Sequence, residues 1–321
     1  MPEWIADLID ALREPLVAFA SPHKRVYWPF LASALALAIG FWVVRERRRV
    51  GLLSYLFPRA VWWHASARLD YKLLFARAVV RALIFAPLAI SATTLAVELA
   101  TIIRLRVGMA PTSTVPASVV VPSFTVTLFL ADDLGRFALH RLMHRVPALW
   151  ELHKVHHSAE VLTPLSLYRV HPIEAWLNTL RGALTLGVVA GVFVWAFPGR
   201  VRAWEVLGVD AIGFVFATLG ANLRHSHVRL AFGPVLERLF VSPAQHQIHH
   251  SDLREHHDKN FGSALSIWDW MSGSLLIARG DEPLKLGLSS DQKNHRDTVV
   301  GVLVDPVAAA ARALIAPLRA R

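Results

Sequence analysis

Long apolar runs, separated by short polar segments, follow one another along the first two thirds of the chain. Five of them approach the length of about twenty residues that a helix needs to cross the hydrocarbon core of a bilayer. These runs cover residues 26–44, 82–103, 115–131, 182–197 and 206–221. The pattern predicts an all-α fold, a polytopic membrane helical bundle of about four to five spans.

The distribution of basic residues predicts the orientation of this bundle. Loop 45–81 holds nine Lys or Arg residues, whereas the connections 104–114 and 198–205 hold two each. Cytoplasmic loops carry the excess of positive charge, so we expect loop 45–81 in the cytoplasm and the N-terminus outside. Alternation of the runs then places the polar segments that follow residues 131 and 221 on the cytoplasmic side. We expect those segments to form a helical cap.

The N-terminal segment differs from the apolar runs. Its apolar residues, from Trp4 to Leu16, recur at helical spacing, and acidic residues stand between them where a signal peptide would be basic. This pattern is typical of an amphipathic helix on a surface.

Composition narrows the class of protein and the chemistry open to it. Charged residues make up 18% of the chain, below the roughly 25% usual in soluble domains. The net charge of +10 comes from residues that flank apolar runs, which favours a membrane protein and no nucleic-acid partner. Cysteine is absent, which excludes disulfides, thiolate zinc sites and iron–sulfur clusters. Any metal must therefore be held by nitrogen and oxygen.

Histidines are concentrated in the polar segments. Thirteen of the sixteen lie between His140 and His257. Their spacings give one HxxxH and two HxxHH motifs, made of His140 and His144; His153, His156 and His157; and His246, His249 and His250. On a helix each motif presents its imidazoles on one face within a turn. Surface or core histidines would scatter, so we interpret these eight as metal ligands.

Eight imidazoles exceed the needs of one ion, because a catalytic zinc site typically uses three protein ligands and water. We therefore predict two metals. Imidazole suits zinc, iron, copper and nickel, and the ligands alone do not choose among them. His225, which follows an apolar run, is a further candidate ligand. His227, His171, Asp133 and Asp258 are candidate ligands or hydrogen-bond partners of ligands. His23, His64 and His295, outside the cluster, are interpreted as structural.

Each ligand imidazole needs an acceptor for its other ring N–H. Acidic residues near the motifs in sequence could serve, namely Asp132, Asp133, Glu151, Glu160, Asp252 and Asp258. The residues alone leave several classes open, among them a zinc-dependent membrane hydrolase, a non-catalytic metal-binding membrane protein such as a transporter, and a purely structural metal site.

The ordered motifs resemble the fatty acid hydroxylase superfamily, also called the sterol desaturase family, of integral-membrane di-iron oxygenases. The resemblance covers Asp133 to Ser274 and looks closest to the bacterial and alkylglycerol monooxygenase-like branches. It consists of Asp133 before HRLMH, LWELHKVHHSAE, RVHPIE, NLRHSH, SPAQHQIHHS, DKNFG and SIWDWMSGS. Phe261 stands where the family often has Tyr, Ser272 and Ser274 replace its usual Phe and Thr, and His227 replaces a commoner small polar residue. These departures affect the substrate assignment more than the metal ligands.

This resemblance implies an oxidoreductase that uses O2 to hydroxylate or desaturate a C–H bond in a membrane lipid, whether fatty acyl, sterol-like or ether lipid. It implies that the protein binds two Fe ions, which zinc can replace in purified protein. The implied ligands are His140, His144, His153, His156, His157, His225, His246, His249 and His250, with no catalytic residue apart from the metal centre.

The resemblance also implies partners, a location and a division of the chain. Electrons would come from a separate donor, such as a cytochrome b5-like protein or a ferredoxin with its reductase. We expect a multi-pass protein of the bacterial inner membrane, with its active site on the cytoplasmic side. We expect residues 1–114 to hold the amphipathic helix and two spans, 115–280 the catalytic domain, and 281–321 a C-terminal tail.

Overall fold

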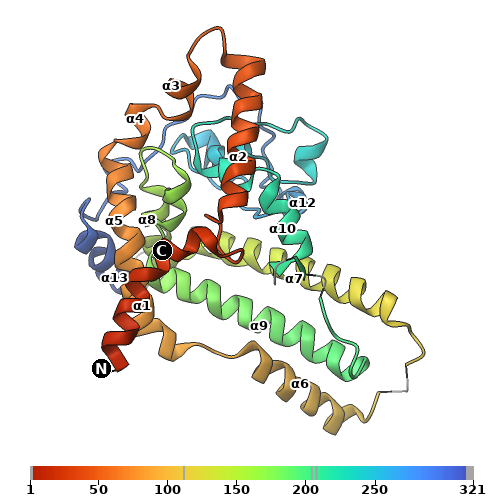
Figure 1. Ribbon diagram of the computed structural model, residues 1–321. Helices are drawn as coiled ribbons and strands as arrows, with labels where there is room; N and C mark the ends of the chain where they lie inside the picture. Colours follow the sequence, from red (N-terminus) through yellow and green to blue (C-terminus); the bar gives the residue numbers. More distant parts are fainter. Residues whose placement is uncertain (1–2, 111–112, 204, 207–208, 316–321) are drawn as a thin grey trace.

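The computed structural model describes residues 3–110, 113–203, 205–206 and 209–315. The described chain is helical apart from one antiparallel hairpin of two short strands, β1 (Glu205–Val206) and β2 (Val209–Asp210). The predicted all-α class is confirmed. Figure 1 shows a layer of long helices at the lower right and a group of short helices and loops beside α2.

Residues 3–107 form a series of helices that are joined by turns and loops. They are α1 (Glu3–Val17), α2 (Trp28–Phe41), α3 (Leu52–Leu56), α4 (Arg59–Trp62), α5 (Ala65–Val80) and α6 (Ala92–Val107). A π-helical turn, Trp42–Glu46, continues α2. A second π-helical turn, Arg81–Phe85, and a 3₁₀ turn, Ala86–Leu88, follow α5. A 3₁₀ turn, Ala18–Ala20, follows α1, the helix predicted from the N-terminal pattern.

The remaining helices carry the histidine motifs and their supports. They are α7 (Ala117–Arg145), α8 (Pro147–His157), α9 (Pro172–Ala196), α10 (Ala211–Thr218), α11 (Pro243–His249), α12 (Ile267–Ser272) and α13 (Val299–Ile315). Four 3₁₀ turns lie between them, η5 (Pro164–Tyr168), η6 (Ala221–His225), η7 (Leu236–Arg238) and η8 (Arg254–His256).

Three helices of the described chain are long and apolar enough to cross a membrane. They are Trp28–Glu46, which combines α2 with its π-helical turn, Ala117–Arg145 (α7) and Pro172–Ala196 (α9). Their outward apolar side chains, such as Leu35, Val126 and Val188, are exposed, as expected of surfaces that face lipid. This supports the predicted membrane protein, and shows that four to five spans is an approximate number.

The other two predicted runs are divided into shorter elements for identifiable reasons. Run 82–103 breaks around Pro87, whose ring removes an N–H donor and clashes with the preceding turn, and α6 begins only after Ser91. Run 206–221 contains Asp210, whose Oδ2 accepts a bond from the Gly213 N–H at 2.6 Å. This cap starts α10, which is only eight residues long.

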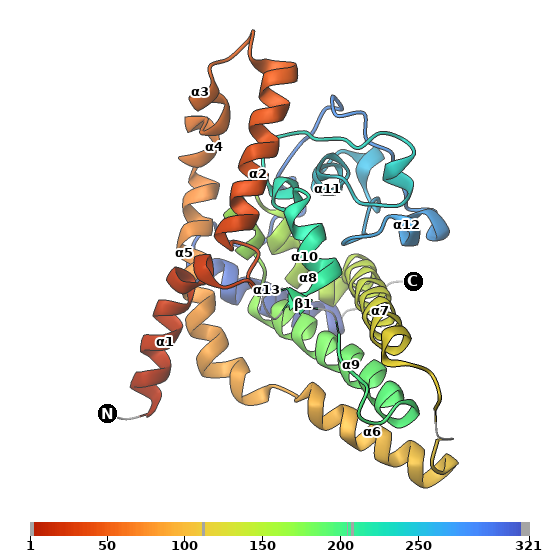
Figure 2. The same cartoon turned by 45° about the vertical axis from the view of Figure 1, so that its right-hand side comes forward.

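Helices α6, α9 and α7 pack side by side in one layer (Figure 2). A Cβ atom at Gly187 would lie 2.6 Å from Leu95 Cβ, and one at Gly191 would lie 2.9 Å from Leu99 Cβ. Glycine at both positions thus allows α6 to approach α9 closely, as small residues do between membrane helices.

The predicted helical cap contains α8, α11 and the loops around α12. Two apolar clusters hold α8 in place: Leu152 packs with Ala148 and Ala310, and Val155 packs with Leu69, Leu73 and Val302. Helices α5 and α13, distant in sequence, therefore support the helix that carries an HxxHH motif. The proposed boundaries at residues 114 and 280 stay a prediction, as does the side of the membrane on which the cap lies.

Candidate metal centre

Two adjacent helices bring the first five motif histidines together. His140 and His144 lie one turn apart near the end of α7, and His153, His156 and His157 lie in the last turn and a half of α8. Pro147, at the first position of α8, fits a helix start because its missing N–H has no partner there in any case. The turn at Val146 therefore folds α8 back against α7.

Helix α11 brings the second HxxHH motif to the same place. Ser242 and Gln245 form a reciprocal capping box at its start. The Gln247 side-chain amide donates to the backbone carbonyls of Leu223, Ser226 and Val228, at 2.9–3.0 Å. These bonds fix the turn that carries His225 against α11.

The nine imidazoles form two groups. The first contains His140, His144, His153, His157 and His249, and the second contains His156, His225, His246 and His250. Within each group the candidate ligand nitrogens all lie within 4.8 Å of one another. Each HxxHH motif is divided between the two groups, so the groups share α8 and α11. All nine histidines predicted as ligands are therefore brought together.

The Nε2 atoms converge within both groups. In the first, His153 Nε2 lies 3.1 Å from His140 Nε2 and 3.2 Å from His157 Nε2. In the second, His225 Nε2 lies 3.3 Å from both His156 Nε2 and His246 Nε2. The Nε2 atoms of His246 and His250 are 3.2 Å apart.

On four of these imidazoles the opposite ring nitrogen faces a hydrogen-bond acceptor, whereas the buried Nδ1 atoms of His246 and His250 have no partner in the described chain. His140 Nδ1 donates to the Phe261 carbonyl and His249 Nδ1 to the Lys259 carbonyl, both at 2.8 Å. His156 Nδ1 donates to the Arg169 carbonyl at 3.2 Å. His153 Nδ1 donates to Glu174 Oε1 at 2.9 Å. These acceptors assign the proton to Nδ1 and leave a lone pair on Nε2.

This donor set fits two metal ions. The lone pairs of His140 Nε2 and His153 Nε2, which face one another at 3.1 Å, repel unless a cation lies between them. The buried Nε2 atoms of His144 and His249 have no hydrogen-bond partner in the described chain. Both groups consist of imidazoles alone, a set that suits iron, zinc, copper or nickel.

Burial keeps the cap histidines neutral. It lowers the pKa of His153 and of His156 from 6.5 to about 3, with neighbouring imidazoles adding to the effect at His156. Burial and neighbouring imidazoles also lower the pKa values of His157, His225, His246, His249 and His250 well below 6.5. Neutral imidazole is the form that binds a metal.

The candidates His171 and His227 lie outside both groups. His171 caps the start of α9 and bonds through Nε2 to the Leu303 carbonyl at 3.0 Å, so it connects α9 to α13. His227 bonds through Nε2 to the Tyr55 carbonyl at 2.6 Å and contacts the Tyr55 ring. Neither contacts a histidine of the groups through a hydrogen bond in the described chain.

The candidate carboxylates near the motifs have other partners. Asp133 accepts from the backbone of Ala264 and Leu265 and from Trp268 Nε1, so it anchors the loop whose Phe261 carbonyl orients His140. Asp258, with a positive φ of 55°, lines a cavity of about 210 Å³ beside His144, His157, His249 and His250. Asp132, Glu151 and Asp252 pair with basic side chains, and Glu160 lies within 4 Å of Lys293 and His64.

Glu174 is the carboxylate that orients a motif histidine. It is 5% exposed in the first turn of α9, and its Oε2 has no hydrogen-bond partner in the described chain. Sequence proximity to the motifs does not identify it, because it lies twenty-one residues after His153. An acidic residue at the start of an apolar helix was the available signal.

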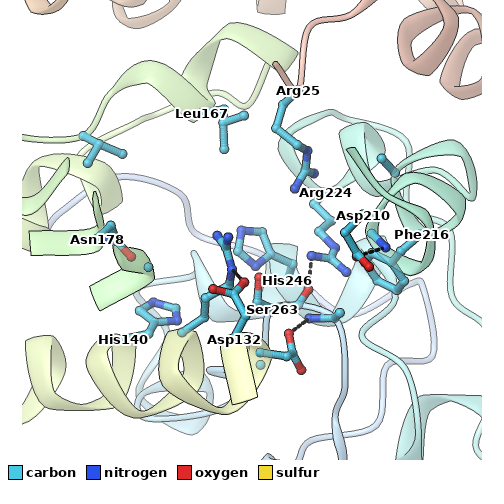
Figure 3. Close-up of a pocket in the computed structure, with 18 of the residues that line it drawn as sticks. Arg25, Asp132, His140, Leu167, Asn178, Asp210, Phe216, Arg224, His246 and Ser263 are labelled. Carbon is cyan, nitrogen blue, oxygen red and sulfur yellow. Dashed lines mark hydrogen bonds and ion pairs between the residues drawn. The ribbon is translucent and has the colours of Figure 1, made fainter. Parts of the chain in front are cut away.

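A cavity of about 670 Å³ opens beside the histidines (Figure 3). His140 and His153 of the first group and His156, His225 and His246 of the second line it. Apolar side chains from α2, α7, α9 and α10 form much of the remaining wall, including Phe30, Leu128, Phe129, Leu186 and Phe216. The centre is therefore open to a mainly apolar space of the size that holds small-molecule ligands.

Residues 125–274 match the family model described as fatty acid hydroxylase. The ornithine lipid hydroxylase OlsE of Rhizobium tropici is 31% identical over 156 residues, which cover 47% of this chain and 42% of that protein. Human alkylglycerol monooxygenase is 30% identical over 146 residues, 46% of this chain and 29% of that protein. The Δ7-sterol 5(6)-desaturase erg3B of Aspergillus fumigatus is 30% identical over 149 residues, 46% of this chain and 38% of that protein.

This chain thus spans less than half the length of these relatives. No solved structure matches it. The matched segment contains α8, α9, α11 and most of α7, and with them all nine histidines of the two groups. Residues 125–274 are thus similar to the fatty acid hydroxylase family over a little under half of the chain.

Proposed function

We propose that this protein oxidises a C–H bond of a membrane lipid, by hydroxylation or desaturation, with O2 and two iron ions. The observation that carries the proposal is the convergence of nine neutral imidazoles into two groups at one end of an apolar cavity. The relatives support the reaction class, because their names describe a lipid hydroxylase, a monooxygenase and a sterol desaturase.

Each group would hold one ion. His140, His144, His153, His157 and His249 would bind the first, and His156, His225, His246 and His250 the second. Iron bound there would supply electrons singly to O2, which is the chemistry that an unactivated C–H bond requires and that protein side chains lack. Zinc would also fit the imidazoles but would favour hydrolysis by activated water.

The residues around the ligands hold them in place and keep the site dry. Glu174 and the carbonyls of Phe261, Lys259 and Arg169 accept the Nδ1 protons and so direct Nε2 inward. The apolar wall of the cavity binds the lipid tail by excluding water from it. Position of the tail over the histidines selects the bond that reacts, and hence hydroxylation or desaturation.

Electrons would come from a separate protein. The sequence has no cysteine to bind an iron–sulfur cluster, so we expect a cytochrome b5-like protein, or a ferredoxin with its reductase, as donor. We place the protein in the bacterial inner membrane with its metal centre on the cytoplasmic side, where soluble donors are found. The basic loop 45–81 and the three apolar helices support this location.

Metal content and oxygen dependence test the proposal directly. Protein purified without a histidine tag should contain about two irons per chain and should change a host lipid only when O2 and a reductant are present. A gain of one oxygen in the lipid would identify hydroxylation, and a loss of two hydrogens would identify desaturation. Tightly bound zinc together with O2-independent turnover would exclude the oxygenase.

Single substitutions test the assignment of the ligands. His249→Ala removes a ligand of the first group and His225→Ala one of the second, so each should lose iron and abolish lipid oxidation. His227→Gln is the matched control, because it retains a donor for the Tyr55 carbonyl outside both groups. Full iron content and activity in His225→Ala would remove that residue from the ligand set.

A further inference from the structure

The cavity beside the metal centre is lined in part by charged residues. Four Lys or Arg residues line it, namely Lys24, Arg25, Arg136 and Arg224. Four acidic residues also line it, namely Asp132, Asp133, Asp210 and Glu174. Formal charges alone therefore do not define the site, and the partners of each charged group decide which charges are free to bind a ligand.

The acidic groups of the cavity are committed to other partners. Asp132 accepts from Arg136 and Arg181, both at 2.7 Å. Asp133 accepts from two backbone N–H groups and Trp268. Asp210 caps α10, and Glu174 accepts from His153. Lys24 is neutralised by Glu14 at 2.6 Å. None of these carboxylates forms an ion pair with Arg25 or Arg224.

Arg25 and Arg224 are the two cavity arginines that lack a carboxylate within ion-pair distance in the described chain. Arg25 donates only to the Ala221 carbonyl, at 2.9 Å, and its Nε has no partner there. Arg224 is 4% exposed, donates to the carbonyls of Val241 and Ser263, and lies over the Phe216 ring. Its Nε is also without a partner.

The two guanidinium groups lie at the same part of the cavity wall. Figure 3 shows the Arg25 side chain extending toward Arg224 there. Both side chains are cationic at neutral pH, because a guanidinium group does not lose its proton in proteins. An anion between them would pair with both charges.

The position of Arg25 fits the headgroup of a lipid. It precedes by three residues the candidate span that begins at Trp28, and the Trp28 ring is 64% exposed. Tryptophan and arginine at the end of a span are typical of the depth at which lipid headgroups lie. Apolar walls continue from this point along α7 and α9, at Leu128 and Leu186.

We propose that Arg25 and Arg224 bind the oxyanion headgroup of an amphiphilic substrate, a phosphate or a carboxylate, whose tail occupies the apolar part of the cavity. The proposal rests on the lipid-oxidising function proposed above, for which it names the substrate class. Planar guanidinium groups match both oxyanions through paired N–H donors. A neutral alcohol headgroup would leave the buried Arg224 and the partly buried Arg25 without a counterion.

Ligand binding without turnover tests this inference. The probes are dodecyl phosphate, dodecanoate and dodecanol, which share one chain and differ in headgroup. They are titrated calorimetrically into the iron-loaded protein in a nonionic detergent, with O2 excluded. We expect at least one of the two anions to bind about tenfold more tightly than dodecanol, the effect of one charge-assisted contact. Preference between the anions identifies the headgroup.

Substitutions locate the anion. Arg25→Gln, which retains a donor for the Ala221 carbonyl, should weaken binding of the preferred anion about tenfold and leave dodecanol unchanged. Arg25→Lys should recover part of the loss. Arg296→Gln is the control, because Arg296 is paired with Asp305 and does not line the cavity, and it should change the affinity less than about threefold.

Two results would overturn the inference: equal affinity for dodecanol and both anions, or equal losses in Arg25→Gln and Arg296→Gln. The binding experiment is independent of catalysis. Anion-selective binding that depends on Arg25, in a protein without O2-dependent activity, would retain this site and reject the proposed function. An active oxygenase that binds all three probes with equal affinity would retain the proposed function and reject this anion site.

Discussion

Arg169 forms a fully buried ion pair with Asp70 while its backbone carbonyl holds the ring of His156. Arg169 Nε lies 2.5 Å from Asp70 Oδ1, and the two residues are 1% and 0% exposed. The rest of the guanidinium donates to Ser66 and Ser158. Asp70 belongs to α5, which precedes the segment that matches the family. This pair therefore connects α5 to a candidate ligand of the second group.

Removing the charge of Asp70 should destabilise the protein and weaken the second metal group. Asp70→Asn leaves Arg169 buried without a counterion, a change that typically costs about 3–5 kcal/mol. We expect a lower midpoint of thermal unfolding and faster loss of metal to a chelator. Asp305→Asn, which breaks the exposed pair with Arg296, is the control and should change both measurements much less. Unaltered chelator kinetics in Asp70→Asn would show that the ion pair does not position His156.

Glu174 should affect the first metal group through His153. Glu174→Ala removes the acceptor for His153 Nδ1, and loss of such a partner typically weakens metal affinity about 10–100-fold. Glu174→Gln retains an acceptor oxygen without the charge, so its affinity should lie between those of the wild type and Glu174→Ala. Competition with a chelator measures this order directly. Glu160→Gln changes an exposed carboxylate and should match the wild type.

The convergence of the eight motif histidines could be predicted from the sequence because it depends largely on local spacing, and their role as ligands stays a prediction. Three residues of each HxxHH motif fall on one face of a short helix wherever that helix lies. The division of each motif between two groups could not be predicted, because it depends on how α7, α8 and α11 meet. The groups that orient the histidine rings also depend on tertiary packing. Glu174, the Phe261 carbonyl and the Asp70–Arg169 pair each connect elements that are far apart in sequence.

The membrane helices also show how far local sequence pattern can predict the fold. Hydropathy identified α7 and α9 because their apolar runs are continuous. It overestimated runs 82–103 and 206–221, because mean hydropathy ignores the backbone effects of Pro87 and the capping effect of Asp210. Both residues can be seen in the sequence, but a single polar or cyclic residue changes the mean hydropathy of an otherwise apolar window very little.

The metal-free protein should lose stability as the pH falls. The folded-state pKa values of His153 and His156 are about 3, below their ordinary value of 6.5. Between these values the unfolded chain binds more protons, so the free energy of unfolding decreases with falling pH. Each histidine contributes a loss of up to about 1.4 kcal/mol per pH unit below 6.5.

Thermal unfolding of chelator-treated protein at about pH 7.5 and about pH 5.5 measures this effect. His156→Gln removes one titrating group, so the difference between the two midpoints should be smaller than in the wild type. Iron-loaded protein should show a weaker dependence in this range, because bound metal competes with the protons. A midpoint of the metal-free protein that is independent of pH would contradict the assignment of neutral, buried imidazoles.

The proposed anion site also predicts which carbon is oxidised. Arg224 directly precedes His225, and the charges of Arg25 and Arg224 both lower the pKa of His225. An oxyanion held by these arginines therefore lies beside the second histidine group, with the first carbons of the tail nearest to both groups. We expect the protein to oxidise dodecyl phosphate or dodecanoate within the first few carbons from the headgroup.

Fragmentation of the product in tandem mass spectrometry locates the new oxygen or double bond. Arg25→Gln should broaden the distribution of products along the chain, whereas Arg296→Gln, outside the cavity, should not. Oxidation near the far end of the tail in the wild type would place the headgroup away from Arg25 and Arg224.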